Sequence, residues 1–555
     1  PKTAWPPTCS SNVGYACFES DSDIVRGVSR VFPLFFFAVA ALVCITTMTR
    51  MVDEQRTQAG VLKALGYSNS AILSQYFLYA GTASLLGCVL GIAAGSYFLP
   101  KMIWHAYNIM YGFTGILYAF DWPLALVSSG AYLLCALGTT WYVVHAELQK
   151  PAAELIRPKA PKAGKRILLE RLPLIWDRLP FLHKVSIRNI LRFKKRMVMM
   201  MIGIGGCTAL LITGFGIQDS ISSVVDYQYD EITRYDAAVT FQHALSGSER
   251  EDFLAVCEES SAEGCLFVAE KSLDASKGST VKTTNVVCPE SGGVEGFIDL
   301  HTQEKAPVPY PQDGGCIISR GLAQALRLSA GDTITLQTGD MRRTELTVEA
   351  VFENYVYNYV YLTQTTWQDV FGEAPGYEAA WVNYQTDEDA QAASAALAGA
   401  KNAAAVTLSR DFRSRVATMM QSLRYIVLVV VLGAAALAFI VLYNLTNINI
   451  TEREREIATI KVLGFYDGET NRYVFRENII LTVLGALLGL PMGTLLHAYV
   501  MGQIKIDLMC FDVRVAPLSY LISAALTLVF GLLVNLALRR KIRAIDMSQA
   551  LKSIE

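Results

Sequence analysis

The sequence predicts a polytopic α-helical membrane protein built from two parallel membrane repeats, with an α+β domain outside the membrane. Three observations support this fold class. Of the 555 residues, 52% are hydrophobic and only 18% are charged, whereas soluble domains average about 25% charged residues. Seven long stretches carry no Asp, Glu, Lys or Arg. A motif of 14 residues near the N-terminus also recurs near the C-terminus.

The charge-free stretches are the predicted membrane spans. A hydrocarbon core about 30 Å thick is crossed by about 20 apolar helical residues. Residues 102–118 are apolar too, but they are rich in glycine and aromatic residues, so we expect them to form an interfacial or exoplasmic segment. The seven predicted spans are residues 31–49, 68–100, 122–144, 197–218, 426–442, 478–500 and 515–538.

The distribution of charge orients these spans. Residues 150–196 hold 14 basic and 3 acidic side chains, a net charge of +11, and short basic segments stay in the cytoplasm. Residues 218–423 hold 14 basic and 30 acidic side chains, a net charge of −16, and are expected outside. Seven crossings then place residue 1 outside, so we expect a further N-terminal crossing in the intact protein, eight in all. The overall net charge of −2 excludes a globally basic nucleic-acid binder.

An internal repeat relates the two ends of the chain. Residues 54–67 align with residues 452–465 at an offset of 398, without a gap. Both copies have the same predicted orientation, so they are parallel repeats about an axis along the membrane normal. The same offset superposes two glycine triplets with a spacing of four, which places small residues on one helix face for close packing. These helix-packing glycines are Gly87, Gly91 and Gly95, and Gly485, Gly489 and Gly493.

The repeat sets the expected domain boundaries. Residues 1–30 are expected to be the C-terminal remnant of a first exoplasmic domain, 31–148 the first membrane repeat, and 149–196 a basic cytoplasmic linker with an interfacial helix. Residues 197–218 form the first span of the second half, 219–423 the second exoplasmic domain, and 424–555 the second repeat with a cytoplasmic tail.

The second exoplasmic domain is expected to be α+β. Residues 333–336, 345–351 and 380–384 alternate like strands, and the alanine-rich residues 389–400 read as a helix. The aromatic run 355–361 is expected to be a strand with one buried face, with a binding surface as the alternative. The acidity of the domain would suit a cationic peptide, although exported surfaces are often acidic.

Several cysteines fall on the predicted outside, where thiols can be oxidised. Cys9 with Cys17, and Cys257 with Cys265, are close enough in sequence to pair, but spacing leaves the connectivity open. The cysteines lack the CxxC or HxxxH spacing of a zinc site, so no metal is expected. The disulfide candidates are Cys9, Cys17, Cys257, Cys265, Cys288 and Cys316.

These motifs resemble the FtsX- and MacB-type (type VII) permeases of ABC transporters. The resemblance rests on the doubled motif E-x4-[AI]-[GA]-x-[LI]-K-x-L-G-[YF], on the basic run 189–196 before a span, and on Pro-Ala-Ala-Glu-Leu at 151–155. Residues 315–323 and 330–336 are similar to the MacB-like periplasmic core. The chain departs from the simplest members by carrying two repeats.

The resemblance implies that ATP hydrolysis and transport belong to separate subunits. The short cytoplasmic helices would couple to two copies of a separate ATPase, which binds ATP and Mg²⁺, while this chain holds no cofactor. Membrane lipids and an exoplasmic protein or peptide are further expected partners, and nucleic acid is not. The implied coupling residues are Glu54, Arg56, Lys63, Leu65, Gly66, Glu452, Arg453, Glu454, Arg455, Lys461, Leu463 and Gly464.

Enzymatic functions find no support in the motifs. The sequence contains no G-x4-G-K-[ST] loop, G-x-S-x-G elbow or H-E-x-x-H pair, so we expect no catalytic residues. We expect a permease of the bacterial cytoplasmic membrane that exports or extracts an amphiphilic peptide, lipid or lipoprotein. Alternatives are a signalling regulator of a cell-wall hydrolase and a module for sensing or resisting antimicrobial peptides. The scarcity of ionisable residues in the spans disfavours an ion-coupled secondary transporter.

Overall fold

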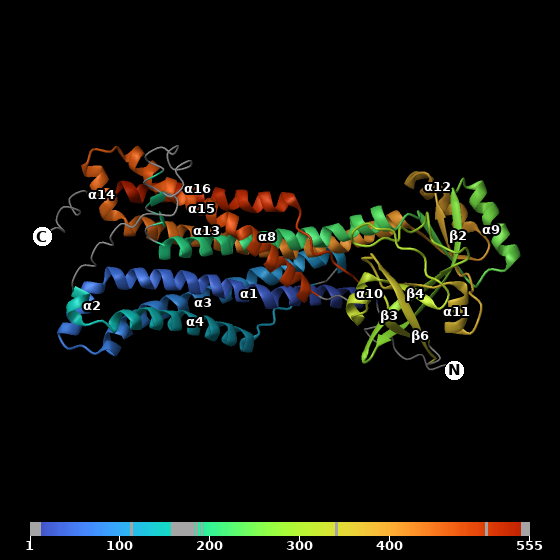
Figure 1. Ribbon diagram of the computed structural model, residues 1–555, viewed down its shortest axis with the longest axis horizontal. Coiled ribbons are helices and arrows are strands. Elements are labelled where there is room, and N and C mark those ends of the chain that lie inside the picture. Colours follow the sequence, from blue (N-terminus) through green and yellow to red (C-terminus); the bar gives the residue numbers. More distant parts are fainter. Residues whose placement is uncertain are drawn as a thin grey trace. The chain divides into compact units, whose positions relative to one another are not determined.

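The computed structural model describes residues 13–111, 115–156, 184, 187–188, 190–191, 194–338, 342–504 and 509–545. These residues form two compact units (Figure 1). The membrane unit contains Arg26–Gln218, Tyr425–Gln503 and the residues from Arg514 onward. The exoplasmic unit contains Asp219–Arg424 and Ile504–Val513, together with residues 13–25.

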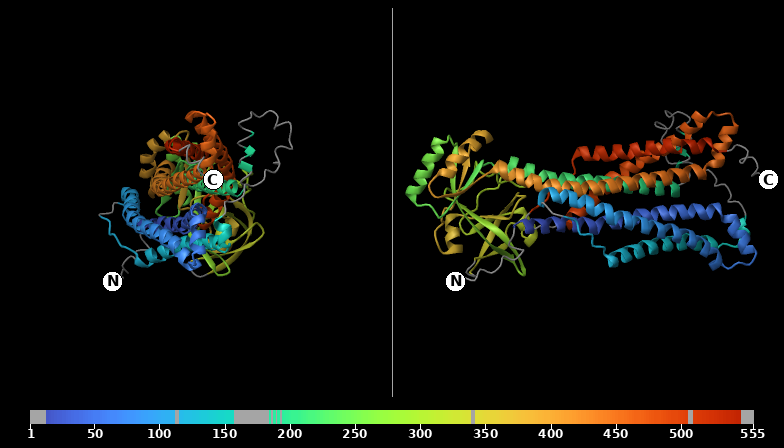
Figure 2. Two further views of the ribbon diagram at one scale, coloured as in Figure 1. Left: turned by 90° about the vertical axis from the view of Figure 1, so that its left-hand side faces the viewer. Right: turned by 180° about the vertical axis from the view of Figure 1, so that it is seen from behind.

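Seven described helices are long and apolar enough to cross a membrane, which confirms the seven predicted spans. Each helix extends beyond its charge-free stretch at one or both ends, where turns that contain charged residues continue it. Figures 1 and 2 show that the helices of each repeat run side by side. In the first half they are α1 (Val13–Glu54), α3 (Asn69–Tyr111) and α4 (Trp122–Leu148), and in the second half α8 (Lys194–Asp226), α13 (Ser409–Glu452), α15 (Asp467–Gln503) and α16 (Pro517–Arg543).

Short helices interrupt the long ones at one end of the membrane unit. In the first repeat α2 (Arg56–Ala64) lies between α1 and α3, and in the second α14 (Glu454–Val462) lies between α13 and α15. After α4, the helix α5 (Ala152–Ile156) packs on α2. Most of the basic linker, residues 157–183, lies outside the described residues.

A nine-stranded mixed sheet forms the centre of the exoplasmic unit, in the order β3-β7-β4-β6-β5-β2-β8-β1-β9. The pairs β3–β7 and β4–β6 are parallel, and the other printed pairs are antiparallel. The strands are β1 (Ala237–Phe241), β2 (Gly264–Lys277), β3 (Thr280–Pro289), β4 (Gly315–Ser319), β5 (Thr333–Gln337), β6 (Arg343–Phe352), β7 (Tyr359–Tyr361), β8 (Ala379–Asn383) and β9 (Ala403–Leu408).

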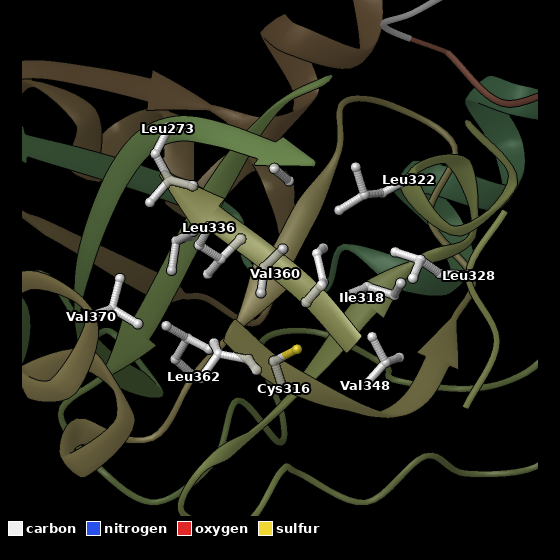
Figure 3. Packing of buried hydrophobic residues seen from close by; sticks show 14 of the residues in the cluster. Leu273, Cys316, Ile318, Leu322, Leu328, Leu336, Val348, Val360, Leu362 and Val370 are labelled. Carbon is white, nitrogen blue, oxygen red and sulfur yellow. The ribbon is translucent and has the colours of Figure 1, made fainter. Parts of the chain in front are cut away.

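Helices cover this sheet because alternate strand residues present apolar side chains to them. In β5, for example, Ile334 and Leu336 are fully buried, whereas Thr335 between them is only partly buried. Figure 3 shows one resulting core, in which Ile318, Leu336 and Val360 from three strands lie together. The described helices and one π-helical turn of this unit are η3 (Tyr227–Ile232), α9 (Gly247–Glu259), α10 (Arg320–Leu326), α11 (Gln364–Phe371) and α12 (Asp387–Gly399).

The expected α+β class is confirmed, but the aromatic run is not one strand. Only Tyr359–Tyr361 pairs as β7, because the chain turns sharply before it. Tyr357 has a φ of 60°, in the left-handed region. The Asn354 side chain stabilises this turn by donating hydrogen bonds to the carbonyl oxygens of Val356 and Tyr357, at 2.7 and 3.0 Å.

Candidate coupling site

The two copies of the recurring motif fold into the same helix and turn. In the first repeat, α2 ends at a left-handed glycine, Gly66, with a φ of 89°. Its N–H donates to the Lys63 carbonyl at 3.2 Å, and the N–H of Tyr67 donates to the Leu62 carbonyl at 3.1 Å. This pair of bonds is the Schellman arrangement, and glycine adopts the required φ without a steric penalty.

The second repeat reproduces this turn at the end of α14. Gly464 has a φ of 94°. The N–H of Gly464 donates to the Lys461 carbonyl at 3.0 Å, and the N–H of Phe465 donates to the Ile460 carbonyl at 3.4 Å. The motif residues K-x-L-G therefore encode one defined turn in both repeats.

A lysine in each motif ties its turn to the third long helix of the same repeat. Lys63 Nζ donates to the carbonyl oxygens of Leu148 and Lys150, at 2.6 and 2.8 Å. Leu148 is the last residue of α4, so the helix leaves its carbonyl unpaired, and Lys150 follows two residues later; a cation is favourable at such a helix end.

Lys461 has the same role in the second repeat. Its Nζ lies 3.1 Å from the Arg543 carbonyl oxygen and 3.5 Å from that of Ile545, just where α16 ends. Lys461 is 8% exposed, and its ammonium also lies 3.4 Å from Asp467. Both predicted coupling lysines thus tie their turn to the end of a membrane helix of the same repeat.

A buried arginine adds a second tie in the first repeat. Arg56 is 8% exposed, and its guanidinium lies 3.1 Å from the Glu147 carboxylate of α4 and 3.8 Å from Glu154 of α5. Gly60 allows α5 to approach α2, since a Cβ there would lie 2.9 Å from side-chain atoms of Leu155 and Ile156. The Pro-Ala-Ala-Glu-Leu sequence therefore forms part of this site.

In the second repeat a buried arginine at the preceding position of the repeat pairs with a different helix. Arg453 is 2% exposed and forms an ion pair with Glu477 of α15, which is 1% exposed. Its guanidinium also contacts Glu456 at 2.9 Å and donates to the Tyr473 hydroxyl at 3.0 Å. Removing Arg453 would leave the Glu477 carboxylate buried and unpaired, so this residue stabilises the fold of the site.

The exposed part of each turn is apolar. Leu65 is 70% exposed and Leu463 is 72% exposed, and aromatic side chains follow each glycine. Among the other predicted coupling residues, Glu54, Gly66, Glu452, Glu454 and Gly464 are exposed, whereas the side chain of Arg455 lies outside the described residues. Tyr466 is 80% exposed and is not among the predicted coupling residues, although the aromatic position beside it belongs to the motif. The exposed tip residues are Leu65 and Tyr67 in the first repeat, and Leu463, Phe465 and Tyr466 in the second.

A groove lies beside the α2 turn of the first repeat. It has a volume of about 390 Å³ and is lined by one side of α2 and the first turns of α3. Its lining is neutral, with glutamines and threonine around an apolar floor that includes Ile72 and Tyr76. The groove is therefore an apolar hollow with hydrogen-bonding edges.

The predicted glycine triplets lie in different surroundings. Gly485, Gly489 and Gly493 of α15 pack against α8, whereas Gly87 and Gly91 of α3 have no described atom within 4 Å of a built Cβ. The predicted helix packing is thus seen for the triplet on α15 and not for the triplet on α3.

The loop between α15 and α16 brings a charge cluster into the exoplasmic unit. Asp512 lies in this loop, and its carboxylate is 3.7 Å from the Arg320 guanidinium, which also pairs with Glu353 at 2.9 Å. Gln303 donates to Asp512 at 3.1 Å, and the N–H of Cys510 donates to the Tyr355 carbonyl at 2.9 Å. The predicted second membrane repeat includes residues 504–513, which the structure groups with the exoplasmic unit. The cluster is not visible in the sequence, because its members are far apart in the chain.

The disulfide candidates include one pair of neighbouring thiols and one pair held apart by a strand. The thiols of Cys257 on α9 and Cys265 on β2 share a hydrogen bond, which lowers the pKa of Cys257 and raises that of Cys265. Cys288 and Cys316 are buried on β3 and β4, on either side of β7, so they are about 9–10 Å apart and beyond disulfide reach of each other. Cys9 and the side chain of Cys17 lie outside the described residues. Within the described ranges, no group of three or more His, Cys, Asp or Glu side chains is placed to hold a metal ion.

Comparisons with known proteins identify both parts of the chain. The family described as FtsX-like permease C-terminal matches residues 30–147 and 428–547. The family described as MacB-like periplasmic core domain matches residues 197–400. A comparison with curated proteins finds no match.

Two solved structures are similar to part of the chain. The extracellular domain of the noncanonic ABC-type transporter YknZ from Gram-positive bacteria is 16% identical, with a TM-score of 0.22, and the match covers 31% of this chain and 98% of that one. The periplasmic region of MacB from Actinobacillus actinomycetemcomitans is 10% identical, with a TM-score of 0.23, and the match covers 33% of this chain and 92% of that one.

The two FtsX-like matches fall on the two membrane repeats, and the MacB-like match begins with α8 and ends in the exoplasmic unit. Seven apolar helices and this domain make the chain a multi-pass protein of the cytoplasmic membrane with a large exoplasmic domain. Permeases of this kind are generally non-catalytic subunits that work with ABC ATPase partners. The chain belongs to the FtsX- and MacB-type permeases of ABC transporters.

Proposed function

We propose that the chain carries both docking sites for its ATPase, so that one copy of the ATPase binds at each cytoplasmic turn. The ATPase subunits bind ATP and Mg²⁺, and their movement is transmitted through the permease to the exoplasmic unit. The observation that carries this proposal is the pair of superposable turns, each with an exposed leucine at its tip and a lysine tie beneath it.

The chemistry of the tips supports a protein partner. Leu65 and Leu463 each stand exposed beside aromatic side chains in a turn that main-chain hydrogen bonds hold rigid. Full burial of one leucine side chain is worth about 1.5–3 kcal/mol. The two turns together could therefore supply much of the energy of a stable complex, and a rigid tip loses little conformational freedom on binding.

The ties beneath the tips support transmission of movement. Lys63 and Lys461 bond each turn to the end of α4 or α16, so a force on a tip acts on the third helix of the same repeat. Along the chain, α15 and α16 are joined by Ile504–Val513, a segment that belongs to the exoplasmic unit. The Arg320–Glu353–Asp512 cluster holds this segment in that unit.

The same machinery would serve export or extraction of an amphiphilic peptide, lipid or lipoprotein, which we propose as the transported class. Regulation of a cell-wall hydrolase, or sensing of and resistance to antimicrobial peptides, would use the same coupling. Ion-coupled transport has less support, because the buried Glu477 is neutralised by Arg453. The neighbouring amides also bond to one another, Asn449 to Asn478 at 2.5 Å and Asn478 to Asn535 at 3.2 Å.

Co-purification tests the docking proposal. The full chain and its ATPase would be expressed together, with Leu65→Glu, Leu463→Glu and both changes combined. Each single change should weaken ATPase binding about 10- to 100-fold, since 1.4 kcal/mol corresponds to a factor of ten. The double variant should retain no ATPase. Ser70→Glu, on the exposed first turn of α3, introduces the same charge nearby and should leave binding unchanged.

The proposal fails if no ATPase accompanies the native chain, or if the double variant retains it. Charge reversal at Arg453 is unsuitable as a test, because this side chain is a buried structural tie. Proteoliposomes containing the complex then separate the functions. ATP-dependent release of a labelled lipopeptide supports export, ATP-dependent activation of an added cell-wall hydrolase supports regulation, and ATP-independent uptake driven by an ion gradient contradicts both.

A further inference from the structure

A hollow opens beside α10 in the exoplasmic unit. Its volume is about 670 Å³, within the range of about 300–1,000 Å³ that small-molecule sites occupy. Arg320, Gln324 and Arg327 line it, and their spacing of four and then three residues places them on one face of the helix. Leu322, on the opposite face, points into the core of the domain (Figure 3). We call this site the α10 hollow.

The polar side chains of the α10 hollow can act as hydrogen-bond donors. The Arg327 guanidinium is exposed and has no partner among the residues that the structure describes. The Gln324 amide oxygen accepts a hydrogen bond from the Cys510 thiol, at 3.7 Å, which leaves the amide nitrogen to donate. Ser329 adds a hydroxyl group. Donors from three side chains therefore face the same space, and they suit a ligand with several acceptor oxygens.

The carboxylates near the α10 hollow already have cations beside them. Glu353 and Asp512 lie 2.9 and 3.7 Å from the Arg320 guanidinium. Asp332 accepts a hydrogen bond from Lys277 Nζ at 2.9 Å. The charge that these pairs leave uncompensated in the lining is positive, so the hollow favours an anion.

Arg327 has a backbone conformation that disfavours a side chain. It ends α10 with a φ of 53° and a ψ of 53°, in the left-handed region. Helices commonly end with glycine in this conformation, because glycine has no Cβ to clash with the backbone. Lys277 Nζ donates to the Arg327 carbonyl oxygen at 3.0 Å and holds the strained residue in place. Strain of this kind is often found at functional sites, which supports a binding role for the guanidinium.

The rest of the lining is apolar. Ala323, Leu328, Ala330 and Val351 contribute it. An isolated inorganic anion would contact the donors but leave this apolar part and most of the volume unused. A guanidinium binds a phosphate through two parallel hydrogen bonds, and the other phosphate oxygens remain free to accept from neighbouring donors. The lining thus matches a ligand that combines a phosphate with an apolar stem.

We propose that the α10 hollow binds the phosphate group of an anionic amphiphile. Arg327 pairs with the phosphate, Gln324 and Ser329 donate to its remaining oxygens, and the acyl stem contacts Leu328 and Val351. This inference rests on the proposed function, because it narrows the transported amphiphile to one with a phosphate head. Binding at the hollow needs no ATPase, so the two proposals can fail separately.

Titration calorimetry of the full chain in a neutral detergent, without ATPase, tests the site. The probe is dihexanoyl phosphatidic acid, and the heat of its mixing with empty micelles is subtracted. We expect one molecule to bind per chain, and Arg327→Gln to weaken binding by about tenfold or more, because a charge-assisted hydrogen bond is lost. Inorganic phosphate and hexanoate should each bind more weakly by about tenfold or more, since each offers only one part of the probe.

The strained backbone supplies a control for folding. Arg327→Gly removes the guanidinium and also the unfavourable Cβ, so it should lose the probe as Arg327→Gln does while the melting temperature of the chain rises. Arg410→Gln makes the glutamine change at an exposed arginine in the first turn of α13, and this variant should bind the probe normally.

Four results would overturn the proposal: no binding of the probe, equal binding by Arg327→Gln, equally tight binding of inorganic phosphate, or displacement of the probe by tetraglutamate, which would assign the hollow to an acidic peptide. None of these results bears on ATPase docking. Conversely, a permease that fails to retain its ATPase should still give the expected titration.

Discussion

Lys63 and Lys461 are 398 residues apart in the sequence, yet each donates to two main-chain carbonyls at the end of the third membrane helix of its own repeat. Each lysine thus connects its exposed turn with the end of a helix about 80 residues further along the chain. This relationship explains why a lysine lies two residues before the leucine of the tip in both copies. It also leads to the first prediction.

Replacing either lysine by methionine should uncouple ATP hydrolysis from transport. Methionine keeps an apolar stem but donates no hydrogen bond, so the tie loses about 1.5–3 kcal/mol. In proteoliposomes, Lys63→Met and Lys461→Met should lower the number of substrate molecules moved per ATP while the ATPase remains bound. Lys101→Met, at an exposed lysine over the Tyr97 ring of α3, is the control. Unchanged coupling in both lysine variants would refute the role of the tie.

The turn glycines should tolerate asparagine better than alanine. Both Gly66 and Gly464 adopt a left-handed φ, which costs a residue with a Cβ about 1–2 kcal/mol, although asparagine visits this region more readily. ATPase affinity, measured by titration of the purified permease, should therefore fall most for Gly66→Ala and Gly464→Ala and less for the asparagine variants.

Gly468→Ala is the matched control for the turn glycines. This residue lies in the first turn of α15, where alanine suits the helix and has open space around it. Equal losses of affinity for alanine and asparagine at Gly66 would show that something other than backbone conformation determines the effect.

Loss of the Arg320 guanidinium should strongly destabilise the cluster that it forms with Glu353 and Asp512. Arg320→Met leaves the carboxylates of Glu353 and Asp512 buried and close together, and breaking such a buried pair costs about 3–5 kcal/mol. Thermal unfolding of the full chain should show a lower transition for the exoplasmic unit. The double variant Arg320→Met with Glu353→Gln should recover part of the loss, since one of the two carboxylates becomes neutral.

Arg327→Met is the matched control for this cluster, because Arg327 is an exposed residue at the end of the same helix, α10. It should unfold like the native chain. If Arg320→Met unfolds at the native temperature, the cluster does not hold the Ile504–Val513 segment in place.

The Cys257 and Cys265 thiols should form a disulfide on mild oxidation. They share a hydrogen bond, and the pKa of the Cys257 thiol is lowered by it, which favours the thiolate that starts the reaction. With a copper–phenanthroline oxidant, the two thiols lose two protons and two electrons to form one S–S bond. Residues 251–271 contain both cysteines and no internal trypsin site, so mass spectrometry of a tryptic digest should detect this single peptide with two hydrogen atoms fewer.

Single serine variants at Cys257 or Cys265 should abolish this product, whereas Cys288→Ser should leave it. Burial raises the pKa of Cys288 to about 12, so that thiol stays protonated and unreactive. A linkage between Cys288 and Cys316 would contradict the strand order, which separates them by β7.

Much of this molecule follows from local sequence signals. Runs without charge predict the spans, because the bilayer core holds no water to hydrogen-bond with the backbone. A segment that crosses it must therefore form a long apolar helix. The repeat predicts the paired turns, since the K-x-L-G spacing encodes a Schellman end in each copy. The long-range ties were not predictable in this way. Neither Arg453 with Glu477 nor Asp512 with Arg320 has a regular spacing, so their burial became visible only when the helices and loops were placed.

The sequence also could not separate the exposed residues of the recurring motif from those that bond within the chain. Lys63 and Leu65 are two residues apart, but one points to a helix end and the other is exposed. Charge suggests the opposite assignment, because lysine is usually the exposed residue of such a pair. The carbonyls at the end of α4 reverse that expectation, and they lie more than 80 residues further along the chain.

The buried arginines, Arg56 and Arg453, show that the two turns cannot replace one another. At the offset of the repeat, Arg56 corresponds to Glu454 and Arg453 corresponds to Gln55, so the anchoring cation has moved by one residue between the copies. Its partners have moved as well, from Glu147 on α4 to Glu477 on α15. A chain with residues 54–67 and 452–465 exchanged would keep both backbones but separate each arginine from its carboxylate. The two repeats therefore share the backbone of the turn, but the ion pair that anchors each turn fits only its own half of the protein.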